Sequence, residues 1–246
     1  MRYNDLCWRG VHASEMGVIV TEPALYKRPA LRHDTVIVPG RSGTLSVLGA
    51  PTYDVVPYTP TLAIRPGADR DAVYRWLTGR GRVIFGSMPE WAYDAVISDQ
   101  IEYTEETPGH PAGYQLLIPT FTCQPYRYEV IPTASIMGQE MLAGFNPGNA
   151  PAAPLIVATV TPGTVLTLCM SGCEDVVLET PEDAGESVQA VLDCDAQVAY
   201  TSEGVALDGA MFGDFPEIAP GSWKLEAKAE NGKVLGLSLL PRWRSV

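Results

Sequence analysis

Two groups of carboxylates are the residues whose type and spacing come closest to a catalytic pattern. The first group is Glu102, Glu105 and Glu106, and the second is Glu182, Asp183 and Glu186. Glycosidases use a pair of carboxyl groups on opposite sides of the scissile bond. Nearness along the chain does not provide that arrangement, and acidic turns are usually solvated loops. We therefore predict that the chain is not an enzyme, and we keep a hydrolase as one alternative.

Five cysteines are scattered along the chain: Cys7, Cys123, Cys169, Cys173 and Cys194. An odd number at irregular spacing does not indicate a disulfide framework. Cys169 and Cys173 could supply half of a metal site, but no Cys/His pair lies near them in sequence. The three histidines, His12, His33 and His110, are also distant from them. We therefore predict free thiols, with no metal and no cofactor.

The serines and glycines do not form a known catalytic or phosphate-binding motif. Ser42 and Ser171 each lie near a glycine, but neither lies in a Gly-x-Ser-x-Gly sequence. The chain has no Gly-Lys-Ser/Thr and no Gly-x-Gly-x-x-Gly that opens a helix. The sequence therefore supports neither serine catalysis nor nucleotide binding.

A tight turn is the candidate for a contact between subunits. The sequence Pro39-Gly40-Arg41-Ser42-Gly43 joins two apolar runs, 35–38 and 44–48. Proline presets one backbone angle and glycine permits positive φ, so the chain can reverse tightly here. Arg41 lies at the tip, where a guanidinium could pair across a subunit boundary. On local physics alone a solvated hairpin is the simpler interpretation, and the subunit contact is its alternative.

Short apolar runs separated by turn residues predict a mainly β chain. The sequence contains 23 Gly and 21 Pro, and this pattern is typical of packed sheets. The lengths and spacing of the runs suit a β-sandwich or jelly roll. The expected strands are 17–20, 35–38, 44–48, 52–58, 61–65, 82–85, 93–98, 114–123, 155–159, 164–170, 175–178, 187–193, 197–200, 222–229 and 234–240.

One segment departs from the β pattern and predicts a short helix over 69–79. Asp69 can cap its start, and Gly79 can end it. Trp76 and Leu77 fall on the same apolar face of this helix. We expect both side chains to anchor the helix on a sheet.

Aromatic residues near the end of the chain allow two interpretations. Phe215 and Trp223 flank a turn formed by Pro220 and Gly221, and we expect both aromatic side chains to anchor this loop on a sandwich. Trp223 or Trp243 could instead form a platform for a sugar ring. A carbohydrate-binding module is therefore the second alternative.

The charge of the chain is unevenly distributed. The net charge is −12. Residues 1–133 carry 12 Lys and Arg against 14 Asp and Glu, whereas residues 134–246 carry 5 against 15. This asymmetry predicts two domains, 1–133 and 154–246, joined by a linker at 134–153 that is rich in turn-forming residues.

Charge and hydropathy also exclude two classes of protein. The chain has no basic stripe, so we predict no specific nucleic-acid binding. It has no apolar run of about 18 residues, so we predict no membrane insertion. The first residues lack the apolar core of a signal peptide, and we therefore expect synthesis in the cytosol.

Short motifs follow one another along nearly the whole chain, and their order is more specific than any one of them. They are 16–18, 38–43, 74–77, 83–85, 88–89, 93–95, 121–126, 146–148, 154, 192–193, 215–216 and 220–221. In this order the set resembles the distal tail proteins of long-tailed bacteriophages, the Dit family. One departure is Ser222-Trp223 after the Pro-Gly turn, where family members often have Asn.

The resemblance implies an N-terminal β-sandwich-like ring domain with one short helix and a projecting hairpin. It also implies a C-terminal galectin-like β-sandwich, or jelly roll. The galectin-like shape does not imply sugar binding, and that alternative would serve adhesion to the host surface. The projecting hairpin could cover the sheet edge of a neighbouring subunit.

The resemblance further implies a structural protein of the virion tail tip that is assembled in the cytoplasm of the bacterial host. It would form a homo-hexamer. Its other partners would be the tail tube protein, a tail-tip or tail-associated protein, and a receptor-binding protein.

Overall fold

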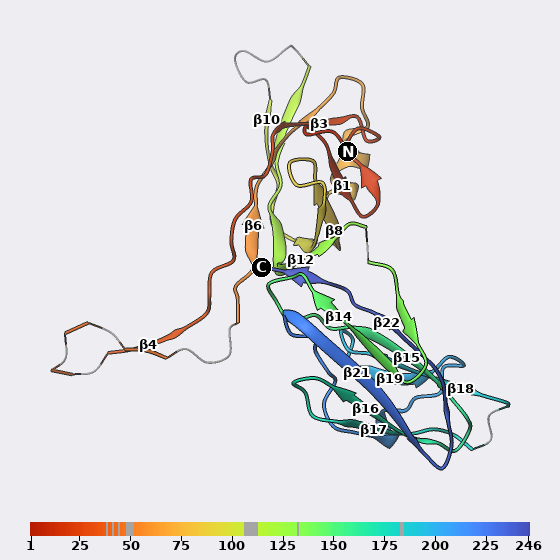
Figure 1. Ribbon diagram of the computed structural model, residues 1–246. Helices are drawn as coiled ribbons and strands as arrows, with labels where there is room; N and C mark the ends of the chain where they lie inside the picture. The colour runs from red at the N-terminus through yellow and green to blue at the C-terminus, as the bar shows by residue number, and fades with distance from the viewer. Residues whose placement is uncertain are drawn as a thin grey trace. The chain divides into compact units, whose positions relative to one another are not determined.

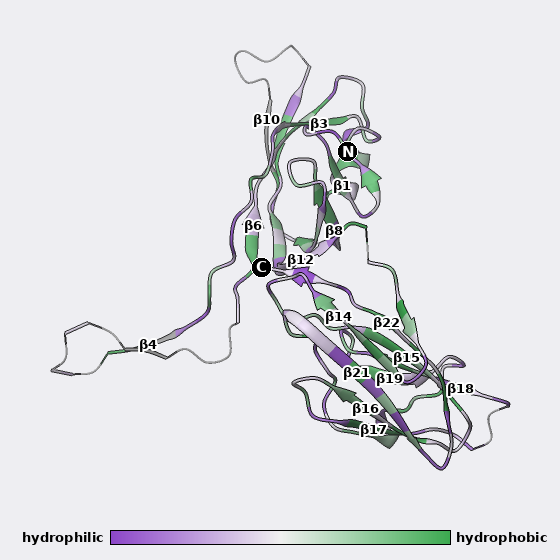
Figure 2. Cartoon of the chain, viewed as in Figure 1, coloured by the Kyte–Doolittle hydropathy of each residue, from purple (hydrophilic) through white to green (hydrophobic). Residues whose placement is uncertain are grey.

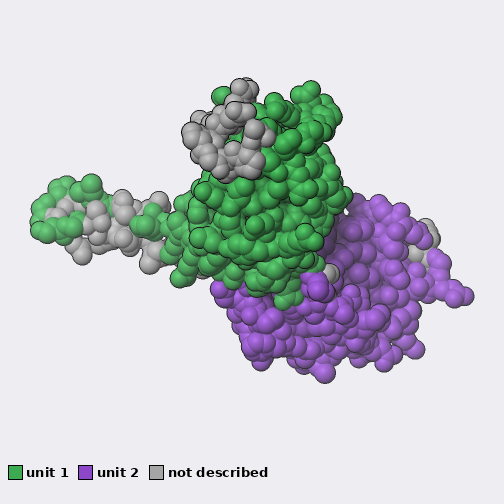
Figure 3. Space-filling model, turned by 90° about the horizontal axis from the view of Figure 1, so that it is seen from above, with its two compact units in different colours: residues 1–130, 246 green, residues 131–245 purple. Residues whose placement is uncertain are grey.

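The computed structural model describes residues 1–37, 39–40, 42–43, 45–47, 52–105, 113–131, 133–182 and 185–246. It is mainly β, with several antiparallel sheets, which confirms the predicted fold class. The chain divides into two compact units, and Figure 3 colours them separately. Unit 1 comprises residues 1–130 and Val246, and unit 2 comprises residues 131–245. Each unit has its own hydrophobic core.

Unit 1 is built from two main sheets and one short ribbon. One sheet has the order β2-β1-β8-β9-β12, with β6 also paired to β12, and the other has the order β10-β11-β7-β3. The ribbon is the β4–β5 pair, and Figure 1 shows β4 in an arm that extends away from the other strands of this unit. The elements are β1 (Leu6–Trp8), β2 (Val11–His12), β3 (Val18–Glu22), β4 (Asp34–Val36), β5 (Leu45–Val47), β6 (Val56–Tyr58), β7 (Thr61–Ile64), α1 (Arg70–Trp76), β8 (Gly79–Phe85), β9 (Trp91–Ile97), β10 (Glu102–Glu105), β11 (Gln115–Ile118) and β12 (Phe121–Glu129).

Aromatic side chains fill the core of unit 1. Phe121 packs edge-on against Trp8, with ring centroids 5.4 Å apart, and against Phe85 at 5.6 Å. Tyr58 and Tyr93 lie beside Phe85, at centroid distances of 5.1 and 6.1 Å. These edge-on and tilted geometries are the favourable ones for aromatic rings.

The helix α1 begins where the sequence predicts and ends earlier. The carboxylate of Asp69 accepts a hydrogen bond from the Ala72 amide at 3.0 Å, which is the expected N-cap. The helix stops at Trp76, and the Leu77 amide donates to the Val73 carbonyl at 2.9 Å. The predicted end at Gly79 is therefore wrong. Gly79, at φ +85°, instead begins β8.

Unit 2 is a two-sheet sandwich. One sheet has the order β13-β22-β15-β18-β19, and the other has the order β14-β21-β16-β17-β20. Figure 2 shows hydrophilic and hydrophobic bands along β21, as expected for a strand with one face on a core. The elements are β13 (Ile136–Gly138), β14 (Met141–Asn146), β15 (Leu155–Val160), β16 (Val165–Met170), β17 (Val176–Glu179), β18 (Val188–Asp193), β19 (Val198–Thr201), the 3-10 helix η1 (Asp208–Ala210), β20 (Met211–Phe212), β21 (Gly221–Glu230), β22 (Val234–Leu240) and β23 (Arg244–Ser245).

The structure corrects two predictions of organisation. The segment 134–153 is not a linker, because it contains β13 and β14 and contributes Leu142, Ala152 and Ala153 to the core of unit 2. The single strand predicted at 114–123 is two strands, β11 and β12, which belong to different sheets of unit 1. No helix in the described ranges has the length and apolar character needed to cross a membrane.

Candidate subunit interface

The arm, residues 31–54, is held together at its base by backbone pairing. The Arg32 amide donates to the Thr52 carbonyl at 2.8 Å, and the Asp54 amide donates to the Ala30 carbonyl at 2.9 Å. Arg32 and Asp54 also form an ion pair, with Nε and Oδ1 2.5 Å apart. Both side chains are more than half exposed, so this pair contributes at most about 1 kcal/mol. Farther out, β4 and β5 pair in antiparallel register, with Thr35 opposite Ser46.

The predicted turn lies at the end of this arm. Pro39, Gly40, Ser42 and Gly43 are exposed to solvent. Gly40 and Gly43 have φ values of +81° and +82°, in the left-handed region that favours glycine. Arg41 lies outside the described residues. The four described residues of the turn are therefore brought together at the surface of the single chain.

Apolar side chains on the arm lie open to water. Ile37 is 78% exposed, Val36 is 48% exposed, and Leu31 at the base is also exposed. Isolated exposed apolar residues are ordinary, but Val36 ends β4 and Ile37 follows it directly, and among the described residues β4 pairs with β5 alone. A two-stranded ribbon is marginally stable alone and gains most when a third strand or another apolar surface covers it. The described part of the arm therefore carries apolar side chains that this chain leaves exposed.

The predicted anchors lie in the two cores. Trp76 is 8% exposed and Leu77 is fully buried in unit 1. The Trp76 indole donates to the Trp8 carbonyl at 3.2 Å, and the Trp8 indole donates to the Trp76 carbonyl at 2.8 Å. This reciprocal pair fixes α1 to β1, and the sequence does not indicate it because the two residues are far apart in the chain.

The aromatic residues proposed for a sugar platform are buried. Trp223 and Trp243 are 5% and 7% exposed, and their ring centroids are 6.4 Å apart. Phe215 is partly buried against the same core. Because a sugar ring stacks on an exposed aromatic face, the structure contradicts the platform interpretation of Trp223 and Trp243.

The carboxylate groups do not form a described catalytic site. Glu102 and Glu105 lie on β10, and Glu182 and Glu186 are both exposed. Glu106 and Asp183 lie outside the described residues. Within the described ranges, no group of three or more His, Cys, Asp and Glu side chains could hold a metal ion.

The five thiols are free, and three of them are buried. Burial raises the pKa of Cys123 to about 12, and it raises the pKa of Cys194 to about 12 as well. Such thiols are protonated at neutral pH and are poor nucleophiles. Cys173 is half-buried, and its Sγ donates to the Glu217 carbonyl at 3.3 Å.

Asn146 is a structural residue that the sequence does not single out. Its buried amide nitrogen donates to the carbonyls of Ile218 and Ala150, at 2.9 and 3.3 Å. Its Oδ1 accepts from the Gly148 amide at 2.8 Å. One side chain therefore joins the 146–150 turn to the loop before β21, and the only sequence signal is an Asn before Pro-Gly.

Several solved structures share the fold of this chain along nearly its whole length. No family model and no curated protein matches the sequence. The Dit protein of phage SPP1, described as a paradigm of the hub adsorption apparatus in phages that infect Gram-positive bacteria, matches with a TM-score of 0.69 and 12% identity over 96% of this chain and 97% of that one. Two structures of the phage P2 baseplate in its activated conformation, one with Ca and one with Sr, each match with a TM-score of 0.51 over 97% of this chain and 98% of that one, at identities of 8% and 9%. The chain therefore has the fold of a phage distal tail hub protein, which confirms the predicted resemblance at the level of the fold.

Proposed function

We propose that this chain is a structural distal tail protein that forms a homo-hexameric ring at the end of a phage tail tube. In this role it acts as a hub for tail-tip and adhesion proteins and has no enzymatic activity. The observation that carries the proposal is the likeness to the SPP1 hub protein along the whole chain, including both units. Its partners are the tail tube protein, a tail-associated protein and a receptor-binding protein. It works at the virion tail tip after assembly in the host cytoplasm.

The arm supports ring formation by unit 1. A closed ring of identical subunits needs a heterologous contact, in which one surface of a subunit meets a different surface of its neighbour. The arm supplies one such surface, with exposed apolar side chains and with β4 and β5 paired only to each other among the described residues. The near-neutral charge of residues 1–133, 12 basic against 14 acidic side chains, limits repulsion between copies.

Electron microscopy of the purified full-length protein tests the proposal. We expect a sixfold ring, and we expect it to bind purified tail tube protein. A protein that stays monomeric at high concentration and binds neither tail tube nor tail-tip proteins would refute the hub role.

Arg41→Glu tests the candidate contact within the ring. Charge reversal in the Pro39–Gly43 turn should weaken ring assembly by roughly tenfold or more, because a cation that pairs across an interface becomes a repelled anion. Arg70→Glu is the matched control, since Arg70 is exposed on α1 away from the arm. Sedimentation velocity measures assembly, and thermal unfolding measures the stability of the subunit. Equal losses of assembly and subunit stability would contradict an interface role for Arg41.

A further inference from the structure

Strand β14 lies at the edge of its sheet in unit 2 and has one free side. In the part of the chain that the structure describes, it pairs with β21 alone, in a regular antiparallel register over its whole length. A free side of this kind presents backbone donors and acceptors that a further strand can use. Which groups are open follows from the hydrogen bonds of β21.

The backbone groups of Met141, Ala143 and Phe145 face the free side of β14. Lys224 of β21 lies opposite Ala143, but its hydrogen bonds go to Ser171, on the far side of β21. The Lys224 carbonyl accepts from the Ser171 amide at 2.9 Å, and the Lys224 amide donates to Ser171 Oγ at 3.1 Å. Residues opposite each other in an antiparallel pair turn their backbone groups either toward or away from each other. Ala143 therefore faces away from β21, and the alternation along the strand places Met141 and Phe145 with it.

The open row extends over Ala143 and Phe145. At one end, Gly138 lies against the Met141 carbonyl, since a Cβ on Gly138 would be 2.8 Å from that oxygen. Farther along, the amides and carbonyls of Ala143 and Phe145 have no backbone partner among the described residues. An added strand can therefore bond to the donor and the acceptor of both residues.

The outer face of this edge is apolar and open to water. Phe145 is 65% exposed, Met141 is 55% exposed, and Ala143 between them is exposed as well. Leu142 and Asn146 point to the other face and are buried. Open backbone groups and exposed apolar side chains thus occur together on the same strand.

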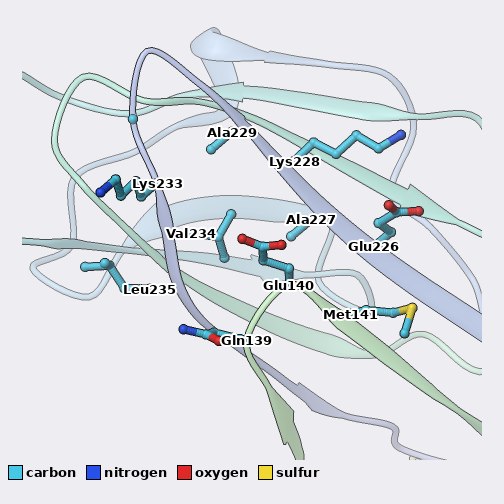
Figure 4. Close-up of a pocket in the computed structure, with 11 residues that line it drawn as sticks. Gln139, Glu140, Met141, Glu226, Ala227, Lys228, Ala229, Lys233, Val234 and Leu235 are labelled. Atoms are coloured by element: carbon cyan, nitrogen blue, oxygen red, sulfur yellow. The ribbon is translucent and has the colours of Figure 1, made fainter.

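The edge carries no charge that calls for a charged partner. No residue of β14 is charged, and on β21 behind it Lys224 and Glu226 pair with each other, with Nζ and Oε2 3.5 Å apart. Figure 4 shows Met141 of β14 and Glu226 of β21, which lie opposite each other. Beside β14, a charged side chain would meet Met141 and Phe145 in place of water. The edge therefore selects uncharged, apolar side chains.

We propose that the Met141–Phe145 edge of β14 is a β-augmentation site for an uncharged, extended segment of a different protein, with apolar side chains at every second position. Only another backbone matches a row of donors and acceptors along a strand, and alternate apolar side chains cover the exposed face. A second copy of the chain fits less well. Residues 134–246 carry 5 basic against 15 acidic side chains, so two copies of unit 2 repel each other.

The test uses the full-length protein and a capped, labelled peptide of alternating Val and Thr. Fluorescence anisotropy should detect binding to the wild type, and peptides with Lys or Glu in place of Val should each bind more weakly. Ala143→Pro removes an amide that faces the free side, where an edge strand tolerates proline. We expect it to reduce affinity about tenfold or more, with little change in the melting temperature.

Ala143→Val is the matched control, because it keeps the amide and enlarges the apolar side chain. It should bind the Val-Thr peptide at least as well as the wild type. A second pair of variants tests the apolar face. Phe145→Gln should weaken binding, whereas Met137→Gln should not, since Met137 is 80% exposed but lies on β13 in the other sheet.

Three results would overturn the proposal: no binding of the Val-Thr peptide to the wild type, equal binding of the Lys or Glu peptide, or equal binding by Ala143→Pro and Ala143→Val. Loss of an assembly by Ala143→Pro in sedimentation without peptide would assign the edge to a second copy and would also overturn it. The hub role does not depend on this edge. A protein that binds the peptide but forms no ring would refute the hub role alone.

Discussion

The reciprocal hydrogen bonds of Trp8 and Trp76 lead to a quantitative prediction. Trp76→Phe keeps most of the buried ring but removes the indole N–H that donates to the Trp8 carbonyl at 3.2 Å. A buried hydrogen bond contributes about 0.5–1.5 kcal/mol, and an acceptor left unmatched costs about 1–3 kcal/mol. We expect Trp76→Phe to lose about 1–2 kcal/mol through this bond, in addition to the cost of the smaller ring.

Trp223→Phe in unit 2 is the control that separates these two costs. Trp223 is also buried, but its indole N–H has no hydrogen-bond partner among the described residues. The two variants remove the same ring atoms, and only Trp76→Phe removes a hydrogen bond. The difference between their losses of unfolding free energy should therefore be about 1–2 kcal/mol.

Native-state hydrogen exchange measures the loss of unfolding free energy in each variant. Peptides from unit 1 and unit 2 report the opening free energy of their own core, so each variant is compared within its unit. Equal losses in the two variants, or a larger loss for Trp223→Phe, would refute the assignment of the hydrogen bond. The stronger variant Trp76→Ala should cost about 3–5 kcal/mol in unit 1.

Three further predictions concern unit 2 and the thiols. Gly144→Ala would place a Cβ 2.8 Å from Cζ2 of the buried Trp223 ring, so it should lower the unfolding free energy of unit 2 by about 1–3 kcal/mol in urea titrations, whereas Gly236→Ala should not. The Arg242 guanidinium donates to both oxygens of Asp193, at 2.6 and 3.0 Å, and holds the pKa of Asp193 below its usual value of 3.8. The stability from this pair is therefore present above about pH 3.8 and is lost as the pH falls through the lowered pKa, and urea titrations of Asp193→Asn at several pH values should lack this part of the acid dependence. Cys123 and Cys194 should resist alkylation by iodoacetamide at pH 8 until urea unfolds the chain, since burial raises each pKa to about 12, and mass spectrometry showing fast alkylation of the native protein would contradict that burial.

Much of the fold could be predicted from the sequence, because apolar and polar residues alternate clearly along several strands of unit 2. β15 and β16 both show a strict alternation of half-buried and buried residues, and each lies where the apolar pattern indicates. β1 could not be found in this way, because Leu6–Trp8 is too short to show a period. β11 and β12 appeared as one strand, since only Pro119 and Thr120 separate them and the switch between sheets depends on pairing with distant residues.

The predicted linker shows how local turn chemistry can mislead. Pro147, Gly148 and Pro151 indicate a loop when they are considered alone. In the structure, Asn146 fixes this turn by hydrogen bonds to Gly148 and Ile218, and Ile218 is remote in sequence. The turn at the end of the arm was easier to predict, because Gly40 and Gly43 are a local signal for positive φ.

The two separate cores also bear on how such a chain can evolve. The core residues of unit 1 and unit 2 form two clusters that share no member. A substitution within one cluster therefore leaves the side-chain contacts inside the other cluster unchanged. Surface residues of unit 2 can then change while selection on the core of unit 1 continues. Divergence of this kind fits a chain that keeps the fold of the SPP1 hub protein at 12% identity.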